Sequence, residues 1–153
     1  MKFIKHIKFS YLFILTSNLL LFTIACTPDD ISSREQFIQK LADNWIIDES
    51  GAVLINGQDI TELFLGFELS INADLTYTTN SNEVSIDEFP WPTAGFFELS
   101  EDETILTRDD GLEIEVSLSD DENSMELIFD ADENTGGRQA GVRGRWRCQF
   151  SRR

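Results

Sequence analysis

Histidine is almost absent from this chain. The 153 residues contain one, His6, which lies ahead of a long apolar run near the amino terminus. A domain that begins after this run has no imidazole to activate a Ser or Cys nucleophile or to bind zinc. The sequence therefore excludes Ser-His catalysis, Cys-His catalysis and His-ligated zinc from that domain.

Cysteine is nearly as rare, since the chain has only Cys26 and Cys148. Cys26 directly follows the apolar run and has a separate role there, so we expect no intrachain disulfide. Cys148 stands between the polar residues Arg147 and Gln149 and shares a strand face with Trp146 and Phe150. This pattern predicts a small buried core residue whose thiol is inert.

Basic residues are few: 12 Lys and Arg face 28 Asp and Glu, for a net charge of −16. Three of the lysines precede Cys26, so the remainder has nine basic residues and a formal charge of −19. Such a surface excludes nucleic acid as a partner and is repelled by anionic headgroups. Six arginines lie near the carboxyl terminus. We expect them to pair with acids of neighbouring strands, and an anion-binding or partner-docking stripe is the alternative.

The chain has one long apolar run, from Phe9 to Ala25, and it is interrupted by polar residues. Lys2, Lys5 and Lys8 precede it. A membrane-spanning helix needs about 20 predominantly apolar residues, which this run of 17 does not reach. A basic start and a short apolar stretch predict that residues 1–25 are a secretory signal.

Cys26 directly follows this run, and the pair Ala25-Cys26 resembles the lipobox of bacterial lipoproteins. Thr23 departs from that pattern, which prefers an aliphatic residue there. The resemblance implies that Cys26 carries lipid, that the bilayer is a partner, and that residues 26–31 form a tethered linker. An ordinary cysteine is the alternative. Asp29-Asp30 resemble a tag for cell-surface display or are a plain solvated linker, so we expect a lipid-anchored protein of the outer membrane.

The next segment, Ile31–Asp43, has the pattern of a short helix. Ser32 to Glu35 form a capping box, and Phe37, Ile38 and Leu41 lie at helical spacing. We expect the helix to pack this stripe on the rest of the domain.

From Trp45 onward, apolar residues alternate with polar ones, which is typical of strands with one buried face. Turn signals such as Asn56-Gly57 and Asp109-Asp110-Gly111 separate the strands. We expect strands near residues 45–48, 52–55, 65–71, 75–79, 95–100, 104–108, 112–118, 124–129 and 142–150. The sequence thus predicts one all-β domain, residues 32–153, an antiparallel barrel or half-barrel of about eight or nine strands with a short N-terminal helix.

The order of several stretches resembles a family of lipocalin-like domain lipoproteins of Gram-negative bacteria. The stretches are Leu41 to Trp45, Ile55 to Thr61, Gly66 to Ile71, Leu75 to Asn80, Trp91 to Phe97, Gly136 to Arg138 and Gly141 to Phe150. The resemblance implies a lipocalin-like barrel with a cup at one end that holds one small ligand.

Lipocalins share a Gly-x-Trp motif whose Trp packs under an Arg from the end of the barrel. Trp45 matches the Trp, and Asp43 replaces the Gly. The resemblance makes Arg143, Arg145 and Arg147 candidates for a cation–π partner, and Arg145 is the one that we name with Trp45 for barrel closure.

Two aromatic residues are candidates for binding a ligand, Trp91 in Pro90-Trp91-Pro92 and Phe96 on the following strand. A Trp held between two prolines could stack on a sugar or another ring; the alternative is that it folds back and plugs the barrel. Asp130 to Gly136 resembles a calcium loop but lacks the spacing of an EF-hand. Adjacent acids, such as Asp109/Asp110, are expected to be solvated turn residues.

These features predict a membrane-tethered, non-enzymatic protein without cofactor or metal. Its barrel would bind a small apolar or glycan-like ligand. The alternative is an accessory interaction subunit of an outer-membrane complex, with a packed, ligand-free barrel and an envelope protein as its partner.

Overall fold

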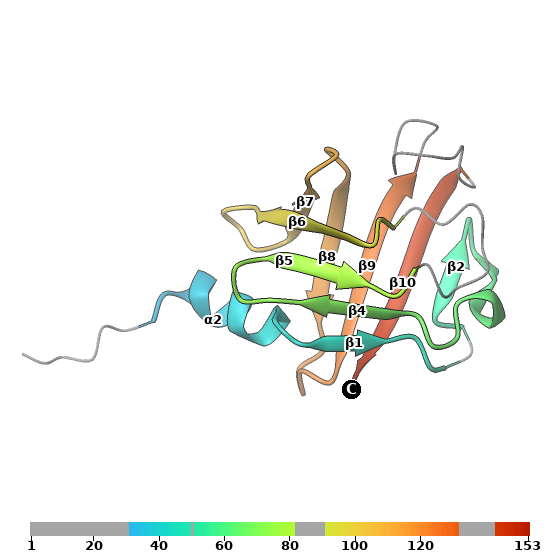
Figure 1. Cartoon of the computed structure of the whole chain (residues 1–153), viewed down its shortest axis with the longest axis horizontal. Coiled ribbons are helices and arrows are strands. Elements are labelled where there is room, and N and C mark those ends of the chain that lie inside the picture. The colour runs from blue at the N-terminus through green and yellow to red at the C-terminus, as the bar shows by residue number, and fades with distance from the viewer. Residues whose placement is uncertain (1–30, 50, 82–90, 132–142) are drawn as a thin grey trace, which may run out of the picture. The chain divides into compact units, whose positions relative to one another are not determined.

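The computed structural model describes residues 31–49, 51–81, 91–131 and 143–153. Contacts divide the chain into two units, 1–32 and 33–153, and the fold below is that of the second. Its elements (Figure 1) are α2 (Ser33–Leu41), β1 (Asn44–Ile46), β2 (Val53–Ile55), β3 (Gln58–Asp59), the 3-10 helix η2 (Thr61–Leu63), β4 (Glu68–Ile71), β5 (Thr76–Thr79), β6 (Ala94–Leu99), β7 (Ile105–Arg108), β8 (Glu113–Leu118), β9 (Ser124–Ala131) and β10 (Gly144–Arg152).

Eight of the strands form a closed antiparallel barrel. Neighbours along the sheet are β1, β4, β5, β6, β7, β8, β9 and β10, and β1 also pairs with β10. In that closing pair Trp45 lies opposite Arg152, and Ile46 lies opposite Ser151. Closure leaves none of these eight strands at a free edge. The predicted all-β, lipocalin-like barrel with a short helix is confirmed.

Strand β10 pairs with two segments on the same side. Its second half pairs with β1 and its first half with β2, where Trp146 lies opposite Ile55. Asn56 fixes the turn into β3, because its N–H donates to the Arg145 carbonyl (2.9 Å) and its Oδ1 accepts from the Arg145 N–H (3.0 Å). Residues 47–67 thus leave the barrel after β1, add β2, β3 and η2 at its side, and return to β4 (Figure 1).

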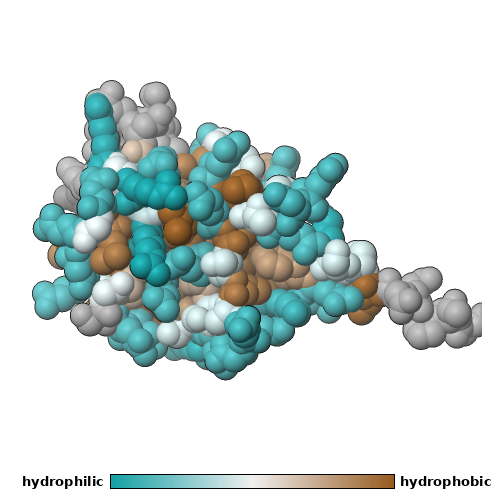
Figure 2. All heavy atoms as spheres, turned by 180° about the vertical axis from the view of Figure 1, so that it is seen from behind, coloured by the Kyte–Doolittle hydropathy of each residue, from teal (hydrophilic) through white to brown (hydrophobic). Residues whose placement is uncertain are grey.

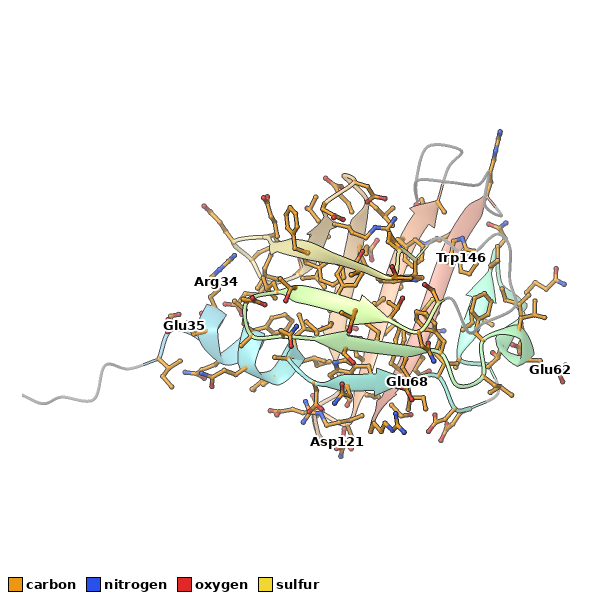
Figure 3. The ribbon with its side chains drawn as sticks, viewed as in Figure 1. Arg34, Glu35, Glu62, Glu68, Asp121 and Trp146 are labelled. Atoms are coloured by element: carbon orange, nitrogen blue, oxygen red, sulfur yellow. The ribbon has the colours of Figure 1, made fainter. Side chains whose placement is uncertain are left out.

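The helix closes one end of the barrel. The Arg34 guanidinium donates to the carbonyls of Leu99 and Ser100 at the β6–β7 turn, at 2.8 and 2.9 Å; Figure 3 shows Arg34 reaching from α2. Lys40 pairs with Glu122 at the β8–β9 turn (2.9 Å). The base of the barrel is therefore covered by α2 and held by contacts to two turns.

The interior is filled by alternate side chains of the strands, as the period of two requires. Tyr77 stacks on Phe97 with ring centroids 4.5 Å apart. Opposite Tyr77 is Gly95, and a Cβ on Gly95 would lie 2.7 Å from the Tyr77 hydroxyl. The absence of a side chain at Gly95 therefore makes room for the Tyr77 ring.

The structure differs from the sequence predictions mainly in the excursion beside β10. The helix is shorter than predicted, Ser33–Leu41. β3 and η2 were not predicted, because elements of two and three residues are too short to show a period. The other strands lie within a few residues of their predicted ranges.

Candidate functional site

Trp91, the first candidate ligand-binding residue, lies inside the barrel and is 3% exposed. Its ring lies 6.1 to 6.5 Å from those of Tyr77, Phe67 and Phe97, and 5.8 Å from that of Phe129. These contacts are mostly edge-to-face, an arrangement that the ring quadrupoles favour. Trp91 therefore fills the interior, as the plugging alternative requires.

A buried cation lies against this aromatic cluster. Arg108 is 1% exposed, and its guanidinium carbon lies 5.5 Å from the centroid of the Trp91 ring. The guanidinium makes a two-pronged ion pair with Asp110, from Nε to Oδ1 at 2.8 Å and from Nη2 to Oδ2 at 2.5 Å. Arg108 was not among the predicted site residues, although it lies two residues after the buried Leu106 and therefore faces the same side of β7.

Two donors in the same cluster have no hydrogen-bond partner among the residues that the structure describes. They are the Tyr77 hydroxyl and the Trp91 Nε1–H, and both atoms are fully buried. Burial raises the pKa of Tyr77 to about 12, although the nearby Arg108 charge acts in the opposite direction. The hydroxyl therefore stays protonated at neutral pH. Because buried polar groups are nearly always satisfied, this pair calls for an acceptor such as a water or a ligand oxygen.

Phe96, the second candidate, lies on the outside of the barrel and is 48% exposed. Its neighbour Phe97 faces inward onto Tyr77, and consecutive residues of a strand point to opposite faces. Phe96 therefore lies on the outer face of the barrel, away from the interior that Trp91 occupies.

Trp45 lies in the strand pair that closes the barrel, and the arginine over its ring is Arg152 and not the expected Arg145. The Arg152 guanidinium carbon lies 5.1 Å from the centroid of the Trp45 ring. Arg152 also donates to the Lys40 carbonyl (2.7 Å) and pairs with Asp43 (3.1 Å). Arg145 and Arg147 face outward from β10, whereas Arg152 lies on the same face of the strand as the buried Trp146.

The outward arginines of β10 form ion pairs across the sheet. Arg145 pairs with Glu115 (3.0 Å) and Asp130 (3.3 Å), and Arg147 pairs with Glu126. The expected pairing with acids of neighbouring strands is thus observed for these two. Among the described residues, these two arginines of β10 are therefore neutralised by acids on β8 and β9.

Acids in two of the turns accept hydrogen bonds from neighbouring serines. Asp102 accepts from Ser100, and Asp121 accepts from Ser119 (both 2.6 Å). These bonds lower the pKa values of both carboxyls. No three His, Cys, Asp or Glu among the described residues are grouped to hold a metal, and most of the calcium-like loop lies outside those residues, as do Cys26 and Asp29-Asp30.

Cys148 is a free, buried thiol on β10. We expect the free energy of unfolding to fall less steeply with pH above pH 9 in Cys148→Ala than in the wild type. Burial raises the pKa of this thiol from its ordinary value of 9.0 to about 12. As pH rises, the unfolded chain therefore loses the thiol proton before the folded protein does. The contribution of the protonated thiol to the free energy of unfolding is fully present below pH 9 and falls by about 1.4 kcal/mol per pH unit above it. Urea unfolding of both proteins between pH 8 and 10 measures the difference, and equal slopes would contradict it.

Three depressions are lined by described residues, and all three open on the outer surface. Two of about 400 and 380 Å³ share Ile105, Glu115 and Ile128 on the outer face of β7, β8 and β9. The third, of about 550 Å³, lies beside η2. Figure 2, a view from behind, shows apolar residues among polar ones across the middle of its face.

Within the described residues, no helix is both long enough and apolar enough to span a membrane. A comparison of the chain with protein-family models, curated proteins and solved structures finds no match.

Proposed function

We propose that this protein is a non-enzymatic interaction subunit of a bacterial outer membrane, tethered through lipid on Cys26. Its barrel serves as a rigid scaffold, and its outer surface binds another envelope protein. The observation that carries this proposal is the filled interior: Trp91 enters the barrel and packs against four aromatic rings, where a cup for a ligand would need open space.

Lipid attachment at Cys26 can be tested by one substitution. Cys26→Ala is expected to move the protein from the membrane fraction to the soluble fraction, because the remaining surface is strongly acidic and has no attraction for anionic lipid. Cys148→Ala is the matched control, since it removes the other cysteine and keeps the tether. Membrane association that survives Cys26→Ala contradicts lipid attachment at this residue.

A second function, binding of a small molecule inside the barrel, is favoured by the two unsatisfied donors on Tyr77 and Trp91. A ligand oxygen would satisfy them, and the Arg108 charge nearby favours an electron-rich group. This candidate requires Trp91 to move, because its ring occupies the space between the surrounding aromatics.

Native mass spectrometry of the full chain, extracted from its own envelope in mild detergent, separates the two functions. The interaction subunit is expected to retain a second protein chain. A small added mass that is lost on denaturation would instead favour the ligand-binding barrel. A lipidated chain that carries neither would contradict both proposals.

A further inference from the structure

The depression beside η2, of about 550 Å³, combines exposed apolar side chains with carboxylates. Its described lining consists of Asp48, Asp59, Ile60, Thr61, Glu62, Leu63 and Leu65, and we call it the Leu63 groove. Leu63 is 59% exposed and Leu65 is 54% exposed, whereas Phe64 between them is 1% exposed. Two large apolar side chains thus face solvent on either side of a buried anchor.

Hydrogen bonds hold the segment that carries these leucines. Thr61 Oγ1 accepts from the Val53 N–H (2.9 Å) and donates to Asp59 Oδ1 (2.6 Å). Phe64 packs edge-on against Trp146, with ring centroids 5.8 Å apart. The groove is therefore built on a fixed frame, so a partner pays little ordering entropy to bind it.

The fold does not require apolar side chains at these two positions. The excursion is attached to the barrel through its buried residues, among them Val53, Thr61 and Phe64. A polar residue at either leucine would leave those contacts unchanged. Exposed apolar side chains that are grouped in one groove and rimmed by polar residues instead mark an interaction site.

The charges around the groove select its occupant. Asp48, Asp59 and Glu62 line it, and no Lys or Arg is among its described lining residues. Asp48 accepts from Ser151 and Asp59 from Thr61. Figure 3 shows Glu62 directed away from the barrel at the η2 end. A second copy of this chain, with its charge of −16, and an anionic bilayer would both be repelled.

We propose that the Leu63 groove binds a segment of a partner protein that presents apolar side chains flanked by Lys or Arg. This inference rests on the proposed interaction function and names the site and the chemistry of the partner. The leucines bury the apolar side chains of the partner and supply the hydrophobic part of the affinity. The carboxylates of the groove attract the flanking cations and set the salt dependence of binding.

A library of displayed random peptides is the probe, selected on the full wild-type chain. The enriched peptides are expected to combine apolar residues with a net positive charge. Leu63→Ser/Leu65→Ser is expected to weaken their binding at least tenfold. Glu62→Gln is expected to weaken it about two- to fivefold and to reduce its salt dependence.

Phe96→Ser is the matched control, because Phe96 is also about half exposed but lies on β6 and lines none of this groove. It is expected to leave binding unchanged, and all variants are expected to keep the wild-type melting temperature. Peptides without net positive charge, or peptides that bind Leu63→Ser/Leu65→Ser as well as wild type, overturn the proposal. Self-association that this double variant abolishes also overturns it, because the occupant would then be a second copy.

The same double variant separates this inference from the proposed function. If the complex extracted from the envelope persists in Leu63→Ser/Leu65→Ser, the interaction function stands and the Leu63 groove is not its site. If no second protein accompanies the wild-type chain, the proposed function itself fails.

Discussion

Replacement of Asp110 by Asn is expected to lower the free energy of unfolding by about 3 kcal/mol. Arg108 is buried against Trp91, and Asp110 holds it with two charge-assisted hydrogen bonds. Asn removes the negative charge and leaves the guanidinium in a low-dielectric interior, where a cation without its carboxylate is costly. Because the Asp110 side chain is 26% exposed, the expected loss lies at the lower end for buried pairs. Urea unfolding monitored by tryptophan fluorescence measures it.

Two variants make this prediction specific. Asp109→Asn changes the neighbouring acid, which is exposed, and is expected to cost less than about 0.5 kcal/mol. Once Arg108→Met has removed the buried cation, adding Asp110→Asn is expected to cost much less than it does alone. Equal costs in both backgrounds would show that Asp110 stabilises the protein without the Arg108 charge.

The second large effect is expected at the base of the barrel, where Trp45→Ala should cost about 4 kcal/mol. Trp45 is fully buried, lies in the strand pair that closes the barrel, and donates from Nε1 to the Leu41 carbonyl (2.9 Å). The substitution removes packing against the core and the link between β1 and the end of α2. Trp45→Phe keeps most of the volume and is expected to cost about half as much. Thermal and urea unfolding measure both variants.

Comparison of Arg152→Ala with Arg145→Ala tests which arginine closes the barrel. Arg152→Ala is expected to cost about 1–2 kcal/mol, because it removes the cation–π contact with Trp45 and the hydrogen bond to Lys40. Arg145→Ala removes two exposed ion pairs and is expected to cost less than about 0.5 kcal/mol. A larger loss for Arg145→Ala would contradict the structural assignment.

Local patterns in the sequence were sufficient for most of the elements. Alternation such as Ile114-Glu115-Val116 places one residue in the core and the next in solvent, so each strand carries its own period. The turns that separate the strands contain residues that accept positive φ, such as Asn56 and Gly111. The helix and the all-β class followed from the same local signals. β3 and η2 were missed, because they are too short to carry a period.

The candidate site depended much less on local pattern. The alternation of polar and apolar residues along β10 predicts that Trp146 faces inward. This alternation does not show which side chains pack next to Trp146. Trp91 follows a segment between two strands, and its contacts with Phe67 and Phe129 join residues far apart in the chain. Leu63 and Leu65 lie in a segment without a regular apolar period, so the sequence does not show which of its residues are exposed. The structure shows that Phe64 is buried and that the two leucines face solvent.

The sequence by itself determined the composition, the scarcity of histidine, the acidic charge, the strand order along the chain and the face on which most strand residues lie. Only the tertiary structure decided that β1 pairs with β10, that Arg152 covers Trp45, that Arg108 is buried beside Trp91, and that the Leu63 groove faces solvent. The physical reason is distance along the chain. Period and turn chemistry act over a few residues. Packing brings Trp91 and Arg108 together from the two ends of the β6–β7 hairpin, and closure joins β1 to β10, the first and last strands, whose register depends on all the strands between them.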